Sequence, residues 1–226
     1  MNPALRAGAA HVFVDTLESI ALSADDAHHL FRVLRLRDGE SVTVSDGRGS
    51  WQSTTVTGGG LLPVGEVVAE RAGQQLTIAA AIPKGDRLEW MVQKLTELGV
   101  SEIVLTHCER SMVRWKQDRA GKQLARLTRV AREAASQSRR VWLPRLGGPV
   151  DIAAVAGLPG AALADPDGDP ASALPGRINV VLIGPEGGFT DAERHLCPQS
   201  VGLGPHILRV ETAAVCAAVL FGGCVG

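Results

Sequence analysis

The chain has 226 residues, a formal net charge of −1 and 45% hydrophobic residues, enough for one large or two small cores. No apolar stretch reaches the roughly 18 residues of a membrane helix, and the first ten residues lack a signal-peptide pattern, so we expect a cytoplasmic protein without a membrane span. The four cysteines form no Cys-x-x-Cys pair and have no histidine at ligand spacing, which argues against a zinc site or a disulfide framework. We therefore expect no metal.

The first domain is expected over residues 1–73, as a small β-barrel. Short alternating runs at residues 11–14, 41–44, 51–57 and 64–68 are separated by turn residues such as Asp46-Gly47, a spacing that is typical of such barrels. One helical segment, residues 25–36, interrupts the strands and carries Arg32 and Arg35, with Arg37 directly after it.

Residues 74–226 are expected to form a second domain of the α/β class, because apolar strand patterns alternate with helical ones. Asp86, with Glu89 three residues later, is expected to cap a helix that ends at Gly99. The Pro/Gly-rich stretches 143–148 and 157–176 are expected to be largely irregular. Strands are expected at residues 76–82, 102–107, 161–164 and 178–183.

A basic segment lies between Arg110 and Arg145, with eleven basic residues against two acidic ones. Arg119, Lys122, Arg126 and Arg129 recur at one helical face, which we call the basic stripe. The net charge alone argues against general nucleic-acid affinity, and the stripe alone is also compatible with a solvated helix face. Together with the arginines near residue 35, it favours contact with phosphates.

Two glycine-containing segments, residues 183–190 and 203–214, carry the functional signal. The first follows an apolar strand pattern and precedes the capping box of Thr190 and Glu193, so its order is strand, glycine loop, helix. Neither segment has the Gly-Lys-Ser/Thr of a P-loop, and their position and spacing disfavour a dinucleotide fingerprint. One such loop could be a simple turn, whereas two favour a nucleoside pocket.

The sequence resembles the RsmE family, SPOUT-class methyltransferases that modify N3 of a uridine in small-subunit ribosomal RNA. The resemblance spans nearly the whole chain in the family's order. It rests on Gly184-Pro-Glu-Gly-Gly188, Leu203-Gly-Pro-x-Ile-Leu-Arg209, Glu211-Thr-Ala213, Lys84-Gly-Asp-Arg-Leu-Glu-Trp90, Gln93-Lys-Leu-Thr-Glu-Leu-Gly99, Glu109-Arg-Ser111, Ala134-x-x-Gln-Ser-Arg139, residues 28–35 and Asp46-Gly47.

This resemblance implies a PUA-like RNA-binding β-barrel over residues 1–73 and a SPOUT α/β domain with a trefoil knot over residues 74–226. It also implies S-adenosylmethionine as cofactor, 16S rRNA or the small ribosomal subunit as substrate, and a homodimer. The apolar segment 212–221 is expected to be buried within the domain or against a second subunit.

Site residues follow from the resemblance. Removal of the N3 proton leaves negative charge on the uracil oxygens, which suits Arg209 as a donor and Glu211 as an aid to proton removal, although a plain ion pair between the two is an equal alternative. The residues expected to hold the cofactor are Ile183, Gly184, Glu186, Gly188, Leu203, Gly204, Leu208, Thr212 and Ala213. Those expected to contact RNA are Arg32, Arg35, Arg37, Arg110, Gln137, Arg139 and Arg140.

Three positions depart from the family pattern: Ser136, His206 and Val210. None is a loop glycine, so the departures concern the grip on RNA more than the cofactor pocket. Two other functions stay open on the sequence, namely methylation of another RNA position or of tRNA, and a non-catalytic RNA-binding role in ribosome assembly.

Overall fold

The computed structural model describes residues 2–174 and 176–222, which form two compact units. Unit 1 comprises the chain up to residue 72 together with residues 132–143, and unit 2 comprises residues 73–131 together with the chain from residue 144. The expected division placed residues 132–143 in the second domain. They lie in unit 1 instead, because the last turns of helix α4 (Gln117–Gln137) and the segment after it pack onto the first sheet.

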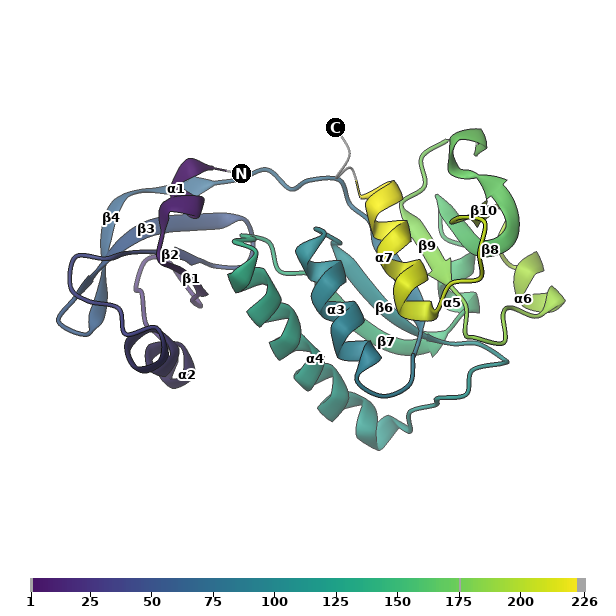
Figure 1. Cartoon of the computed structure of the whole chain (residues 1–226), viewed down its shortest axis with the longest axis horizontal. Helices are drawn as coiled ribbons and strands as arrows, with labels where there is room; N and C mark the ends of the chain where they lie inside the picture. The colour runs from purple at the N-terminus through teal and green to yellow at the C-terminus, as the bar shows by residue number, and fades with distance from the viewer. Residues whose placement is uncertain (1, 175, 223–226) are drawn as a thin grey trace. The chain divides into compact units, whose positions relative to one another are not determined.

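Unit 1 is built on one sheet with the strand order β1-β2-β3-β4 (Figure 1). Its strands are β1 (Ala10–Phe13), β2 (Ser41–Ser45), β3 (Ser50–Thr57) and β4 (Gly60–Ala69), of which β1 and β2 are parallel and the others antiparallel. Within the described residues the outer strands β1 and β4 do not pair, so the expected barrel is an open PUA-like sheet.

Helices α1 (Pro3–Ala7) and α2 (Ala24–His28) complete unit 1, and α2 continues as a π-helical turn over His29–Val33. The expected single helix over residues 25–36 is therefore a short α-helix and a π turn. Arg35 follows with a φ of 56°, a left-handed conformation that few non-glycine residues adopt.

The segment 132–143 closes the core of unit 1. Val141 packs with Leu5 and Trp51, and the Trp142 ring lies 2.2 Å from the position that a Cβ of Gly49 would take. Arg132 donates to the Phe13 carbonyl oxygen at 2.6 Å and its guanidinium lies over the Phe13 ring. A side chain at position 49 would collide with the Trp142 ring. Glycine is therefore required here, in the turn between β2 and β3.

Unit 2 is a parallel sheet with the strand order β10-β8-β9-β5-β6-β7, as the alternating pattern predicts. The strands are β5 (Thr77–Ala81), β6 (Glu102–His107), β7 (Arg145–Asp151), β8 (Ala161–Pro170), β9 (Val180–Ile183) and β10 (Ser200–Gly202). Strand β7 occupies a stretch that was expected to be irregular, and β8 extends well beyond residues 161–164.

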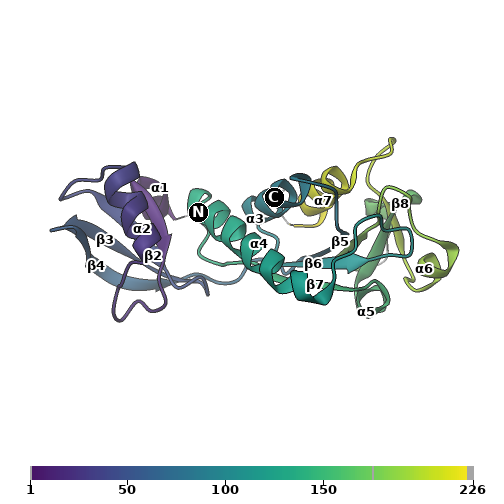
Figure 2. The same cartoon turned by 90° about the horizontal axis from the view of Figure 1, so that it is seen from below.

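Helices cover both faces of this sheet (Figure 2). One face holds α3 (Arg87–Glu97), α7 (Val210–Phe221) and Leu127 and Ala131 of α4, and the other holds α5 (Ala153–Ala156). Along β5, Ile78 and Ala80 join the first core and Ala79 and Ala81 the second, as the two-residue period of a strand requires.

The ends of the helices follow local sequence signals. Thr190 and Glu193 form the expected capping box of α6 (Asp191–His195), and Gly99, which follows the C-cap residue Leu98 of α3, has a φ of 85°. Among the described residues Asp86 makes no side-chain cap hydrogen bond, contrary to expectation. Helix α7 is buried on the sheet side, but Val219 and Leu220 are exposed. The trefoil knot implied by the resemblance stays a prediction.

No helix in the described ranges is long and apolar enough to cross a membrane. Over the same ranges, no three His, Cys, Asp or Glu side chains are grouped as ligands of a metal ion would be.

Candidate active site

A cavity of about 240 Å³ opens at the carboxyl edge of the unit 2 sheet, where β9 ends and the pairing of β8 with β9 stops. These strands are parallel with Ala164 beside Ile183, so Asp165 and Gly184 follow at the same edge. Ligands of parallel α/β sheets bind at this edge. The cavity is lined by Ala164, Asp165, Pro166, Ile183, Gly184, Pro185, Glu186, Gly188, Phe189, Arg194, Leu203, Gly204, His206, Ile207, Leu208, Arg209, Val210 and Ala213.

The glycine loop over residues 184–189 folds back on itself at the end of β9. A Cβ on Gly184 would lie 2.9 Å from the Phe189 ring, so glycine at this position lets the buried ring pack against the backbone. Gly188 has a φ of 68°, and its N–H donates to the Pro185 carbonyl oxygen at 2.8 Å. Two of the six positions therefore require glycine: Gly184 for the space beside the Phe189 ring, and Gly188 for its left-handed φ.

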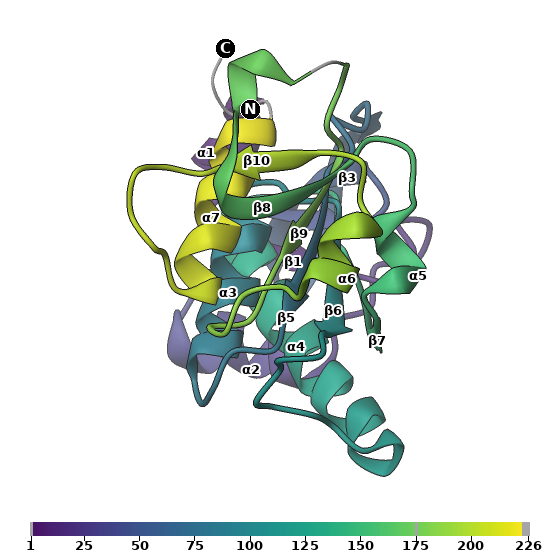
Figure 3. The ribbon, with the colours of Figure 1, turned by 90° about the vertical axis from the view of Figure 1, so that its right-hand side faces the viewer.

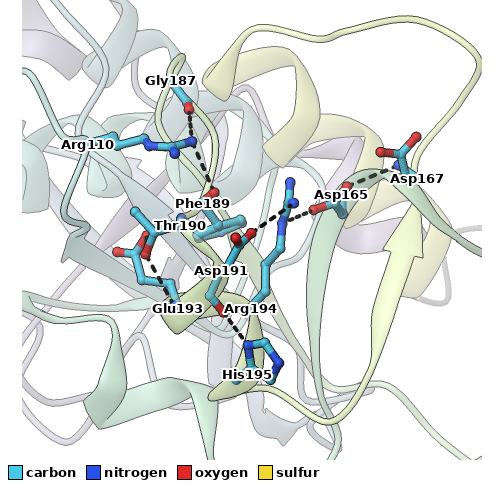
Figure 4. Close-up of polar contacts among 10 residues, drawn as sticks. All are labelled: Arg110, Asp165, Asp167, Gly187, Phe189, Thr190, Asp191, Glu193, Arg194 and His195. Carbon is cyan, nitrogen blue, oxygen red and sulfur yellow. Dashed lines mark hydrogen bonds and ion pairs between the residues drawn. The ribbon is translucent and has the colours of Figure 1, made fainter.

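Two side chains outside the loop hold it in place (Figure 4). Arg110 donates to the carbonyl oxygens of Gly187 and Phe189, at 3.0 and 3.3 Å. Glu193 accepts the backbone N–H groups of Thr190 and Glu109, at 2.8 and 2.7 Å. Burial, with the Glu193 carboxylate nearby, raises the pKa of the Cys108 thiol to about 11, so this thiol is neutral and unreactive.

Asp165 and Arg194 form an ion pair in the cavity wall, with 2.9 Å between Arg194 Nε and an oxygen of the largely buried Asp165 carboxylate (Figure 4). The other Asp165 oxygen accepts the N–H of Asp167 at 3.0 Å. Sequence reasoning missed both residues. The available signal was an acidic residue directly after the strand pattern at residues 161–164, at the edge where parallel strands end.

Residues 203–209, the first part of the second segment, lead from β10 into α7 (Figure 3), and all of them except Pro205 line the cavity. Arg209 is the N-cap residue of α7 and its side chain is exposed, whereas Glu211 is buried in the first turn of this helix. The ion pair between Arg209 and Glu211, which the sequence left open as an alternative to a catalytic role, is not formed. Instead, Glu211 lies 3.6 Å from Arg87, which also lies 3.8 Å from Glu186.

Most residues expected to hold the cofactor meet at this cavity. Thr212 alone is not among the lining residues, since its side chain is exposed on the first turn of α7. Those in the cavity wall are Ile183, Gly184, Glu186, Gly188, Leu203, Gly204, Leu208 and Ala213. Arg209 lines the cavity as well, and the carboxylate of Glu211 lies on the Arg87 side of α7.

The residues expected to contact RNA take different positions. Arg32, Arg35, Arg37 and Gln137 are exposed in unit 1, and Arg32 borders a shallow hollow with His28 and Phe31. Arg139 donates to the Gly8 carbonyl oxygen at 2.9 Å, and burial lowers the pKa of Arg140 to about 10. Arg139 and Arg140 therefore have structural roles in unit 1, as Arg110 has in unit 2.

The cavity fits an adenosine-containing ligand with a charged tail. Apart from the adjoining residues of the chain, no described protein atom lies within 4 Å of where a Cβ would sit on Gly188 or Gly204, so this space is free for a ligand against the backbone. Ile183, Leu203 and Leu208 supply apolar walls for a flat base, and Asp165, Arg194 and Arg209 supply charge at the rim. S-adenosylmethionine combines these features.

Comparison with known proteins agrees with this geometry. A profile of the RNA methyltransferase domain family matches residues 70–222, and one of the RNA methyltransferase PUA domain matches residues 22–60. A ribosomal RNA small subunit methyltransferase E from Bacillus subtilis is 30% identical over 225 residues, which cover 88% of each chain. This chain belongs to the ribosomal RNA small subunit methyltransferase E family.

Other similar proteins agree with this assignment. The protein of the same name from Synechocystis is 34% identical over 86% of this chain and 70% of its own. A methyltransferase from Legionella pneumophila, solved with the bound cofactor SAM, has a TM-score of 0.82 at 25% identity and covers 94% of this chain and 96% of its own. The Neisseria gonorrhoeae enzyme bound to S-adenosyl methionine has a TM-score of 0.78 at 26% identity, over 93% and 95% of the chains.

Proposed function

We propose that this protein transfers a methyl group from S-adenosylmethionine to N3 of a uridine in 16S rRNA. The observation that carries the proposal is the cavity between the glycine loop and residues 203–209, at the carboxyl edge of a parallel sheet, in a chain of this family. Since the substrate is part of the ribosome, we propose that the protein acts in the cytoplasm.

The cofactor is held mainly by backbone groups and apolar side chains. Gly184, Gly188 and Gly204 let the adenosine approach the main chain, while Ile183 and Leu208 cover its faces. The Asp165–Arg194 pair and Glu186 suit the charged amino-acid tail, and Ala213 leaves room beside α7. When bound, S-adenosylmethionine supplies an electrophilic methyl group on a positively charged sulfur.

The residues of the chain then have two tasks at the uridine. Within the described residues Arg209 forms no ion pair, so its exposed guanidinium is available to the uracil oxygens or to a phosphate as negative charge develops. Glu211 has a buried carboxylate oxygen, Oε2, without a hydrogen-bond donor among the residues described. This oxygen suits the role of acceptor for the N3 proton.

RNA contact outside the cavity is proposed for unit 1, through exposed Arg32, Arg35 and Arg37, and for the basic stripe of α4. A homodimer is proposed through the exposed apolar residues Val219 and Leu220 of α7 and Trp90 of α3, two helices that lie side by side (Figure 3). Large apolar side chains on neighbouring helices of this kind are typical of subunit interfaces.

Isothermal titration of the purified protein with S-adenosylmethionine, and separately with NAD and ATP, tests the cavity assignment. We expect S-adenosylmethionine alone to bind, at about one molecule per subunit, because each chain carries the cavity described above. Absence of binding both with and without small ribosomal subunits would leave a non-catalytic assembly factor as the better reading.

Mapping of the product tests the position of methylation. A methyl group on N3 blocks the Watson–Crick edge of uracil, so it stops reverse transcription one nucleotide before the modified base. Small subunits from a strain that lacks the gene, incubated with the protein and S-adenosylmethionine, should gain one such stop in 16S rRNA. Methylation at another position or in tRNA would contradict the proposal and retain the enzyme class.

A further inference from the structure

Arg87, the first residue of α3, lies between two carboxylates that belong to the two cavity segments. Its Nη1 is 3.6 Å from an oxygen of Glu211 and 3.8 Å from an oxygen of Glu186. Its Nε donates to the Lys84 carbonyl oxygen at 3.1 Å, which fixes the direction of the side chain. One guanidinium thus connects the glycine loop with the first turn of α7.

Glu211 is only half satisfied by this contact. Its side chain is 8% exposed, and its Oε2 lacks a hydrogen-bond donor among the described residues. The first turn of α7 favours negative charge, and Arg87 supplies a second positive neighbour. Burial of a carboxylate oxygen without a donor is unfavourable, so this arrangement is suited to receive a donor from a ligand.

The distances indicate that Arg87 acts on Glu211 mainly through charge. Both contacts are longer than a charge-assisted hydrogen bond, and Arg87 is about one third exposed. The strands β5 and β9, which also pack against α7, carry no charged side chain. Within the described residues, Arg87 is the cation of another element that lies within 4 Å of the Glu211 carboxylate.

We infer that Arg87 is a positioning residue for Glu211, whose carboxylate it holds with Oε2 free to accept the N3 proton. This inference rests on the proposed function, in which Glu211 assists proton removal. Neither Arg87 nor Glu211 is among the residues that line the cofactor cavity, so the pair is expected to act on the chemical step and not on cofactor binding.

The test measures kcat and KM for methylation of small subunits, S-adenosylmethionine affinity by calorimetry, and urea unfolding. Arg87→Gln should lower kcat roughly ten- to hundredfold, within the range of acid–base catalysis, and leave cofactor affinity unchanged. Arg87→Lys, which keeps the charge, should restore most of kcat. Lys94→Gln removes an ion pair with Glu97 from the same helix and should match the wild type.

Double variants decide whether Arg87 acts through Glu211. In the Arg87→Gln/Glu211→Gln protein, kcat should equal that of Glu211→Gln alone, because residues that act as a unit are not additive. Urea unfolding of the wild type, the two single variants and the double variant should show non-additive changes in stability. This measurement does not depend on activity. Additive losses in kcat, no coupling in unfolding, or a kcat loss in Glu186→Gln equal to that in Arg87→Gln would overturn the inference. Full activity of Glu211→Gln, by contrast, would refute the proposed role of Glu211.

Discussion

Arg194 Nε lies 2.9 Å from the Asp165 carboxylate in the cavity wall, and the exposure of the two partners is unequal: the Asp165 side chain is 8% exposed and that of Arg194 46%. Removal of the arginine alone leaves the buried Asp165 carboxylate without a cation. Removal of both charges leaves no uncompensated charge in the cavity wall. We expect Arg194→Met to destabilise unit 2 by about 1–2 kcal/mol, a value reduced for the exposure of Arg194.

The double variant Arg194→Met/Asp165→Asn is the control for that prediction. It should be more stable than Arg194→Met, since the uncompensated charge is gone. Urea unfolding followed by circular dichroism measures both. Equal stability of the single and double variants would show that the pair does not contribute through charge.

Substitution of Gly184 by a larger residue is expected to abolish cofactor binding without unfolding the protein. A valine side chain would meet the Phe189 ring from 2.9 Å and force the ring or the loop into the cavity. We expect Gly184→Val to abolish S-adenosylmethionine binding in calorimetry while circular dichroism remains unchanged. Gly157→Ala is a matched control, because nothing lies within 4 Å of its Cβ position and its φ is −88°. Tight binding by a folded Gly184→Val protein would refute the pocket assignment.

The basic stripe of α4, formed by Arg119, Lys122, Arg126 and Arg129, predicts salt-dependent RNA binding. All four side chains are exposed, but Arg126 is paired with Glu89 at 2.7 Å. Neutralising the four residues should weaken RNA affinity and reduce the slope of log K against log salt by about 2–3, since the paired arginine contributes less. Filter binding over a range of potassium chloride concentrations measures the slope. An unchanged slope would mean that the stripe is a solvated helix face.

His11 predicts acid sensitivity of unit 1. Its ring lies between the Thr43 hydroxyl and the Arg140 carbonyl oxygen, and burial, with Arg139 nearby, lowers its pKa to about 4. Because the folded pKa lies below the unfolded value near 6.5, the contribution of neutral His11 to stability is complete above about pH 6.5. It is lost as pH falls towards 4, by on the order of 3 kcal/mol. Urea unfolding between pH 7 and pH 4 should show this loss in the wild type and less of it in His11→Gln.

Much of the fold was accessible from residue patterns, because periodicity reports burial. The strand at residues 102–107, the capping box of Thr190 and the left-handed Gly99 are confirmed by the structure. Strand β7 was missed because its sequence, Arg-Leu-Gly-Gly-Pro-Val-Asp, has no alternation. It pairs nonetheless, since Gly148 brings the backbone against Leu105, at a point where any Cβ would clash.

The candidate site was accessible only in part. The glycine loop and residues 203–209 are each continuous in sequence, so motifs mark them. Asp165 and Arg87 reach the same region from elements far away along the chain, and the contacts that give them a role depend on the packing of the sheet and of α3. A single sequence shows which residues are charged but not which carboxylate each cation meets.

Because residues 132–143 belong to unit 1, they affect when this unit can fold during translation. Leu5 and Trp51 are covered by Val141, a residue synthesised ninety positions after Trp51. During translation the first sheet must therefore wait for more than half of the chain to emerge before its core is closed, although domains usually fold as they leave the ribosome. A fragment that ends at residue 72 would leave Trp51 uncovered, and a nascent chain of that length is an expected client for chaperones.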